Sequence, residues 1–247
     1  MISILICSIN PARFDAVRKM YAAALGNEPF ELIGIHDAKS LAEGYMRALQ
    51  VARGEIIIFS HDDIEILNDQ FPQRIFSHLS GCDMFGVAGT DLLVGPNWMS
   101  AGPPHLLGQV AHTQPDGSLV ASLFSAPRPL VLNVQALDGL FIAAKRAVVN
   151  HVSFDPVTFD GFHLYDLDFS YSAFRSGIKL GIAMDINILH ASVGNYNQVW
   201  AVYAERFLRK WAGKLPPFNI RQFAWATVLI SNKMEALELM KPFYWDQ

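Results

Sequence analysis

The feature that most constrains the fold is an alternation of short apolar segments and amphipathic segments over the first 90 residues. Four segments are predicted to be buried strands, at residues 2–7, 30–35, 55–59 and 84–88. Three segments between them are predicted to be helices, at residues 11–25, 40–52 and 68–79. Ser40, with Glu43 three residues later, is typical of a helix start. This alternation predicts an α/β fold, in which helices cover both faces of a mostly parallel central sheet.

The second half of the chain is less regular. Residues 90–128 are rich in Pro, Gly, Ser and His, and we interpret them as an inserted loop or lid with a hairpin turn at Asp116-Gly117. Further elements are predicted as strands at residues 130–135, 139–145 and 179–188 and as a helix at residues 165–176. Residues 1–195 are therefore expected to form one domain, and residues 196–247 a mostly helical C-terminal extension that packs on it.

Composition narrows the classes of function. Apolar residues make up 51% and charged residues 17% of the 247, as in a globular protein, and a net charge of -4 without basic blocks argues against nucleic-acid binding. Two cysteines are too few for a disulfide framework, which favours a reduced, cytoplasmic setting. The apolar start lacks a basic segment, and residues 223–230 are far shorter than the roughly 20 residues of a membrane helix. The sequence leaves open whether the aromatic, basic C-terminal third contacts the inner face of a membrane.

Polar residues follow the predicted strands, at the edge where parallel sheets bind ligands. Ser8 follows the first strand, His36-Asp37 the second, and His61-Asp62-Asp63 the third. Mn²⁺ or Mg²⁺ at a phosphate site uses one or two carboxylates and completes its shell with phosphate oxygens and water. The two adjacent acids could therefore serve a metal and a phosphate, although Asp is also an ordinary turn residue.

The segment RGEIIIFSHDDIEI, residues 53–66, resembles family 2 glycosyltransferases. There a helix and a strand lead into an Asp-X-Asp motif that holds the metal and the nucleotide diphosphate. The resemblance implies that Asp63 ligates the metal and that His61 and Asp62 contact the nucleotide part of the donor. His61 stands in the place of the first Asp, and an imidazole nitrogen there can ligate Mn²⁺ or donate to a ribose or phosphate.

A second segment, FDGFHLYDLDFSYSAFRSGIKLGI at residues 159–182, resembles the Glu-Asp-X-Asp-Leu helix start of the same family. Tyr165 replaces the Glu, and the resemblance implies that Asp166 is the catalytic base that takes a proton from the acceptor hydroxyl. Asp168 is then an acceptor contact or a structural residue. Ordinary capping of a helix start is the alternative for both acids.

Two more segments match in the same order. ALDGLFIAAKR, residues 136–146, resembles a strand that lines the acceptor side of the pocket, which implies acceptor contacts from Asp138 and Gly139. His190 in DINILHASVGN matches a histidine that is a metal ligand in many members of the family. A turn before an amphipathic strand, and an ordinary core histidine, are the corresponding alternatives.

Nucleotide contacts are implied for Ser8 and Asp37 by their positions after the first two strands. Other polar and aromatic residues are candidates by position alone, with solvated surface or packing as the alternative: Arg13, Lys39, Arg47, Asn97, Trp98, His105 and His112.

Taken together, the resemblance implies a Rossmann-like nucleotide-diphospho-sugar transferase (GT-A) fold and a bacterial glycosyltransferase-like subgroup of family 2. It implies metal-dependent, inverting transfer of a sugar, with Mn²⁺ or Mg²⁺, from a nucleotide-diphospho-sugar donor to a hydroxyl of a glycan, lipid-linked or other acceptor, as in polysaccharide biosynthesis. A non-catalytic binding homologue is the first alternative, because His61 and Tyr165 replace acids. A sugar nucleotidyltransferase is the second, but SINPAR, residues 8–13, is a poor phosphate loop. Nothing in the sequence predicts an oligomeric state.

Overall fold

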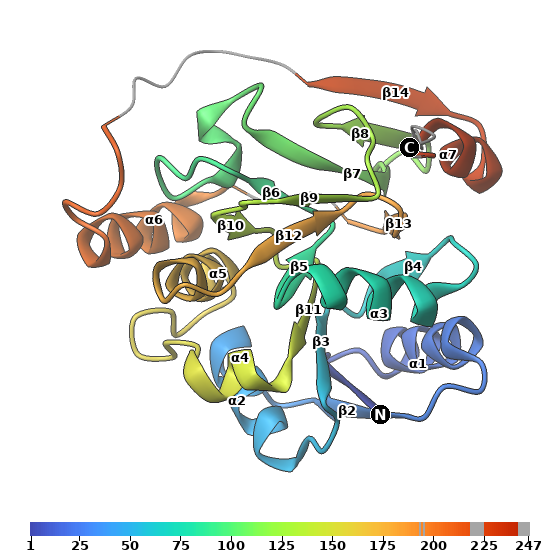
Figure 1. Ribbon diagram of the computed structural model, residues 1–247, viewed down its shortest axis with the longest axis horizontal. Helices are drawn as coiled ribbons and strands as arrows, with labels where there is room; N and C mark the ends of the chain where they lie inside the picture. The colour runs from blue at the N-terminus through green and yellow to red at the C-terminus, as the bar shows by residue number, and fades with distance from the viewer. Residues whose placement is uncertain (193, 195, 218–224, 242–247) are drawn as a thin grey trace.

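The apolar segments of the first half form the strands of a central sheet in the computed structural model, which describes residues 1–192, 194, 196–217 and 225–241 (Figure 1). Among these residues the sheet runs in the order β2 (Phe30–Ile35), β1 (Ile2–Cys7), β3 (Ile56–Ser60), β11 (Phe141–Lys145), β5 (Met84–Gly86), β12 (Leu180–Ala183) and β9 (Leu130–Leu132). Strands β1, β2, β3, β5 and β12 point one way, and β9 and β11 point the other. The predicted α/β class with a mostly parallel sheet is confirmed.

Helices cover both faces of this sheet (Figure 1). On one side lie α1 (Pro11–Leu25) and α3 (Phe71–Gly81), and on the other lie α2 (Leu41–Val51), α4 (Arg146–His151) and α5 (Tyr165–Arg175). The first two helices begin where the sequence predicts. The Asn10 side chain accepts hydrogen bonds from the second and third residues of its helix, and Ser40 accepts one from the Glu43 amide.

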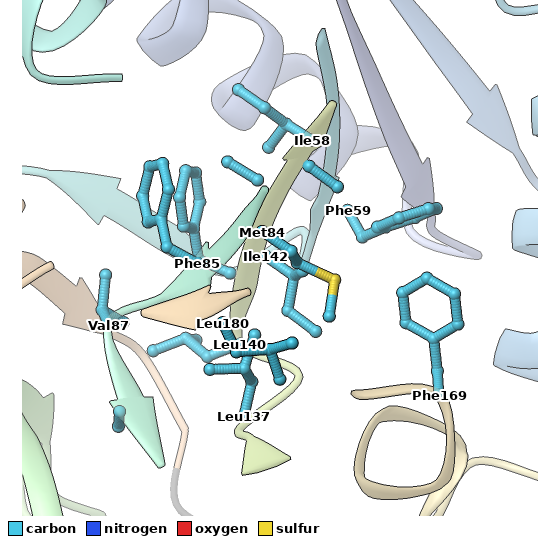
Figure 2. Close-up of a cluster of buried hydrophobic side chains, with 14 of the residues drawn as sticks. Ile58, Phe59, Met84, Phe85, Val87, Leu137, Leu140, Ile142, Phe169 and Leu180 are labelled. Carbon is cyan, nitrogen blue, oxygen red and sulfur yellow. The ribbon is translucent and has the colours of Figure 1, made fainter. Parts of the chain in front are cut away.

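Buried apolar side chains cluster where β3, β11 and β5 meet (Figure 2). Phe59 of β3 is buried against Phe169 of α5 and Phe154, with ring centroids 5.7 and 5.0 Å away. Burying such a side chain stabilises the fold by about 1.5–3 kcal/mol. Because β3 is held from both faces, the residues that follow it leave the sheet at a fixed place.

The loop expected over residues 90–128 is instead largely regular. It contains the short helix η1 (Trp98–Ala101) and the hairpin of β7 (Leu106–Thr113) and β8 (Leu119–Leu123), whose turn includes Asp116 and Gly117 as predicted. The glycines of this segment suggested a loop, and Gly108 shows why that inference fails. The φ of Gly108 is +106°, and a Cβ there would lie 2.2 Å from the Val87 carbonyl oxygen. The glycine permits close strand approach rather than a loop.

This hairpin belongs to a second sheet, of seven strands within the described part of the chain. The main path runs β10 (Ala136–Leu137), β6 (Ala88–Thr90), β7, β13 (Ile188–His190) and β4 (Ile64–Ile66), and β8 joins β7 to β14 (Ala226–Ile230). In Figure 1, β7, β8 and β14 lie at the top of the view, beyond the central sheet.

The C-terminal extension is helical only in part. It includes α6 (Gln198–Lys210) and α7 (Lys233–Leu239), but β14 between them pairs antiparallel with β8. Residue 195 and two parts of the predicted extension, 218–224 and 242–247, lie outside the described residues. Among the residues described, none of the helices combines the length and hydropathy needed to cross a bilayer.

Candidate active site

Two strand ends and one helix start converge on the candidate site. His61, Asp62 and Asp63 connect β3 to β4, and His190 is the last residue of β13. Strand β13 pairs antiparallel with β4, so that His190 lies opposite Ile64, and the Ala191 amide donates to the Asp63 carbonyl at 2.9 Å. This pairing brings residues 127 positions apart, 63 and 190, into contact.

His61, Asp63 and His190 form what we call the cation cluster. One ligand atom from each lies within 4.8 Å of the others. His190 Nε2 is 3.2 Å from Asp63 Oδ1, and His61 Nδ1 is 4.0 Å from the same oxygen. Two imidazole nitrogens and one carboxylate oxygen are a donor set that suits a divalent transition metal such as Mn²⁺. The three residues therefore fit the cation that the sequence implies.

The electrostatics of the cluster favour an ionised Asp63 and a neutral His61. Burial acts to raise the pKa of Asp63, but the hydrogen bond and charge of His190 outweigh it and hold that pKa below its usual value. Burial, together with neighbouring His190, lowers the pKa of His61. A carboxylate that stays ionised beside a neutral imidazole is ready to act as a ligand.

Asp62 points to the ends of the first two strands. Ser8 Oγ donates to Asp62 Oδ2 at 2.5 Å, and His36 Nδ1 lies 2.8 Å from the Ser8 carbonyl oxygen. Arg13 Nη1 is 4.0 Å from Asp62 and 3.8 Å from Asp63. Arg13, Asp62 and Asp63 also line a cavity of about 670 Å³ between α1 and β4.

Asp37 lies at the exposed rim of this region. Its side chain is 78% exposed and pairs with Arg47, and it lines neither of the two cavities that the site residues share. Lys39 is also exposed. Their predicted roles stay predictions.

The second half of the site is a pair of acids, Asp138 and Asp166, which we call the carboxylate pair. Asp166, near the start of α5, accepts a hydrogen bond from the Gly139 amide at 2.7 Å through Oδ2. Asp138 accepts from Trp98 Nε1 at 2.9 Å and from the Leu140 amide at 3.0 Å. A Cβ at Gly139 would lie 2.7 Å from the Cβ of Asp166, so this contact requires glycine.

Burial of Asp166, together with the nearby charge of Asp138, raises its pKa to about 7. At neutral pH such a carboxyl group is ionised in part of the molecules and is a stronger base than an ordinary aspartate. This is the property expected of a general base.

A cavity of about 510 Å³ joins the two halves of the site. It is lined by His61 and His190 of the cation cluster and by Asp138, Gly139 and Asp166. His112 lines it as well, with its ring 5.7 Å from that of His190. The cation cluster and the carboxylate pair can therefore face one bound substrate.

Three rings form an aromatic wall on the same cavity: Trp98, Phe124 and Trp225. Successive ring centroids are 5.0 and 5.4 Å apart. Trp98 was a candidate from sequence, whereas Phe124 and Trp225 were not. They follow β8 and precede β14, and the pairing of these strands, which carried no recognised sequence signal, brings them to the site.

Asp168 was predicted to be an acceptor contact or a structural residue. It is 1% exposed, accepts from Lys210 Nζ at 2.8 Å and from Trp211 Nε1 at 2.9 Å, and does not line the cavity. These contacts join α5 to the end of α6 and favour the structural alternative. His105 likewise faces Asp91, at 2.8 Å, and lies outside the cavity lining.

Comparisons with known proteins identify the family and the fold of the chain. The sequence model of a glycosyltransferase-like family matches residues 3–212. The mannosyltransferase PcManGT from Pyrobaculum calidifontis, solved with GDP-Man and Mn²⁺, is 12% identical, with a TM-score of 0.49 over 97% of this chain and 68% of its own. GalNAc-T7, solved with UDP, GalNAc and Mn²⁺, is 11% identical, with a TM-score of 0.50 over 87% of this chain. The chain spans about half of the GalNAc-T7 chain, 48%. A search of curated protein sequences gave no match. The likeness to GalNAc-T7 is one of fold, and it confirms the predicted GT-A type.

Proposed function

Since this chain belongs to the glycosyltransferase-like family, we propose that it moves a sugar from a nucleotide-diphospho-sugar donor to a hydroxyl acceptor, with inversion at the anomeric carbon. One observation carries the proposal. His61 and His190 of the cation cluster line the same cavity as the carboxylate pair, and the pKa of Asp63 is lowered whereas that of Asp166 is raised. Environments that separate two carboxyl groups in this way assign them different roles.

The cation cluster is the proposed donor side. His61, Asp63 and His190 would hold Mn²⁺ or Mg²⁺, and their two imidazoles favour Mn²⁺. When bound, the cation would neutralise charge on the leaving diphosphate. GalNAc-T7 was solved with UDP and Mn²⁺, which supports looking for the same class of ligand here.

The nucleotide is proposed to lie along the ends of the first strands. Ser8 and Asp62 are hydrogen-bonded to one another at the end of β1, where a ribose or phosphate could contact both. Asp37 is proposed as a peripheral contact to the base or ribose. Arg13, 3.8 Å from Asp63, adds a positive charge near the place proposed for the diphosphate.

Asp166 is the proposed base. The acceptor oxygen attacks the anomeric carbon, and the bond between that carbon and the leaving diphosphate oxygen breaks. At the same time the proton of the acceptor hydroxyl passes to the Asp166 carboxylate. The Gly139 amide orients that carboxylate through Oδ2, and Asp138 is proposed to contact a sugar hydroxyl. Attack from the face opposite the leaving group gives inversion.

The lining of the cavity favours a sugar acceptor over a lipid tail. Polar side chains that could bond sugar hydroxyls surround the aromatic wall: Asn97, His112, Gln114, Ser122 and Thr227. A pyranose has an apolar C–H face for aromatic rings and hydroxyls for polar groups, whereas a lipid tail needs an apolar lining throughout. We therefore propose a glycan acceptor. Free Cys7 and Cys82 fit a proposed cytoplasmic setting, and contact with the inner membrane face belongs to the same proposal.

A screen of nucleotide-sugar hydrolysis tests this function. UDP-, GDP- and dTDP-sugars are incubated with the protein and Mn²⁺, and released nucleotide diphosphate is measured by chromatography. We expect release from one nucleotide class, and its loss in Asp63→Ala.

A non-catalytic binding role is the second candidate, because His61 and Tyr165 stand where the family resemblance places acids. Mn²⁺-dependent nucleotide binding with no release from any donor would favour that role over transfer. Absence of both binding and release would contradict the proposed function.

A further inference from the structure

The two residues that replace acids contact each other. His61 Nε2 lies 3.2 Å from the hydroxyl oxygen of Tyr165, although the residues are 104 positions apart. His61 follows β3, and Tyr165 begins α5. The same contact therefore links the cation cluster to the helix that holds the proposed base.

Tyr165 is held firmly in place. It is 5% exposed, and its ring packs against Tyr45 and Phe154, with centroids 5.8 and 6.2 Å away. The preceding Leu164 has a φ of +62°, a left-handed conformation that sets the start of α5. The hydroxyl therefore has little freedom to leave His61.

The contact decides which imidazole nitrogen faces the cluster. Nε2 lies at Tyr165, whereas Nδ1 lies on the side of Asp63, 4.0 Å from its Oδ1. The Tyr165 hydroxyl is also 3.4 Å from the Gly139 carbonyl oxygen, to which it can donate. If the tyrosine proton is directed there, its oxygen accepts from Nε2–H, and the lone pair of Nδ1 remains for a cation.

We propose that Tyr165 is a positioning residue for the cation site: its hydroxyl fixes the Nε2–H tautomer and the ring orientation of His61, so that Nδ1 is presented as a ligand. The inference rests on the proposed function, because it requires a cation at His61, Asp63 and His190. Removing a residue that accepts a hydrogen bond from a metal-binding imidazole usually lowers the metal affinity about 10–100-fold.

The same hydroxyl connects the two halves of the site. The Gly139 carbonyl oxygen lies 3.4 Å from the Tyr165 hydroxyl, and the Gly139 amide donates to Asp166 at 2.7 Å. Placement of His61 and placement of the base are thus linked through one residue, Gly139. Tyr165 is not itself placed at the reacting atoms, so its role is one of geometry.

Mn²⁺ titration of the full chain, followed by electron paramagnetic resonance, tests the inference. Tyr165→Phe removes only the hydroxyl, and we expect the Kd for Mn²⁺ to rise about 10–100-fold. Tyr171→Phe is the matched control: Tyr171 lies on the same helix, is 2% exposed, and donates its hydroxyl to the Lys214 carbonyl, outside the cavity. The Kd of the Tyr171→Phe variant for Mn²⁺ should equal that of the wild type.

The outcomes separate this inference from the proposed function. Tight Mn²⁺ binding by the wild type that is unchanged in Tyr165→Phe would overturn the inference alone. Failure of the wild type to bind Mn²⁺ would contradict the cation site itself and the inference with it. Adding Tyr165→Phe to His61→Ala should cause no further loss of affinity, because the hydroxyl then has no imidazole to orient.

Long-range proton–nitrogen NMR gives a readout that does not depend on a variant of Tyr165. The His61 signals, assigned by their absence from His61→Gln, should show the Nε2–H tautomer in the wild type. A neutral His61 that is protonated on Nδ1 would overturn the inference.

Discussion

Asp63 and Asp166 are both aspartates of the candidate site, but their surroundings shift their pKa values in opposite directions. Asp63 lies between His61 and His190, and its pKa is held below the usual value although burial acts to raise it. Asp166 is buried near Asp138, a second acid, and its pKa is raised to about 7. One carboxylate remains ionised and suits a cation, while the other can exchange a proton near neutral pH. The comparison shows that neighbours, rather than residue type, set these pKa values, and it supports the proposed donor role of Asp63 and the proposed acceptor role of Asp166.

The largest expected effect comes from removing the base. Asp166→Asn should lower the rate of transfer by about 10²–10⁴-fold, because an amide cannot take the proton of the acceptor hydroxyl. Nucleotide binding with Mn²⁺ should stay near the wild-type level, since the cation cluster is unchanged. Transfer rates and calorimetric nucleotide affinities measured on the same preparations check both statements. An equal loss of binding and transfer would remove the distinction between the two acids.

A smaller effect is expected from crowding the acceptor side. In Gly139→Ala the new Cβ would lie 2.5 Å from the Tyr165 hydroxyl and 2.7 Å from the Asp166 Cβ, so the start of α5 must shift. A displacement near 1 Å can cost about 10²-fold in rate, which we expect to see in kcat. Gly95→Ala is the control, because a Cβ there meets nothing within 4 Å. Wild-type kcat in Gly139→Ala would show that the base tolerates displacement.

The pH profile sharpens the comparison further. Below a pKa of about 7 Asp166 becomes protonated, so kcat/KM, which reports groups of the free enzyme, should fall up to tenfold per pH unit as the pH decreases and level off above pH 7. A flat kcat/KM profile from pH 6 to 8 would contradict the assignment of the base.

The same shift affects stability. The pKa of Asp166 is about 7 in the folded state, whereas that of an ordinary aspartate is about 3.9, so the folded state retains a proton that the unfolded chain releases. The unfolding free energy should therefore decrease as the pH rises from about 4 to 7. Asp166→Asn should reduce that decrease, as denaturant titrations at several pH values would show.

The sequence predicted the parts of the molecule that depend on local signals. The strands β1 and β3, the helix start at Pro11, the cap at Ser40 and the polar residues after each strand follow from hydrophobic runs and turn chemistry. The turn at Asp116-Gly117 was predicted, but the strands β7, β8 and β14 were missed, because glycines and small residues there serve close strand pairing, which is a non-local property.

The same distinction explains the site. The motif order drew attention to Asp63, His190, Asp138 and Asp166, but it assigned His61 to the nucleotide rather than to a cluster with Asp63 and His190. It could not give pKa values, which depend on burial and on neighbours from other segments. Asp168 was assigned partly to the acceptor because the sequence does not reveal that Lys210 and Trp211, at the end of α6, occupy both its oxygens. The His61–Tyr165 contact was equally hidden, since each residue looked like an isolated replacement.

Calorimetric titration with UDP and with GDP, each with and without Mn²⁺, tests the division between the two acids most directly when wild type, Asp63→Ala and Asp166→Asn are compared. We predict that the wild type and Asp166→Asn bind one nucleotide diphosphate in a Mn²⁺-dependent way, whereas Asp63→Ala loses that dependence. Unchanged Mn²⁺-dependent binding in Asp63→Ala would contradict the account.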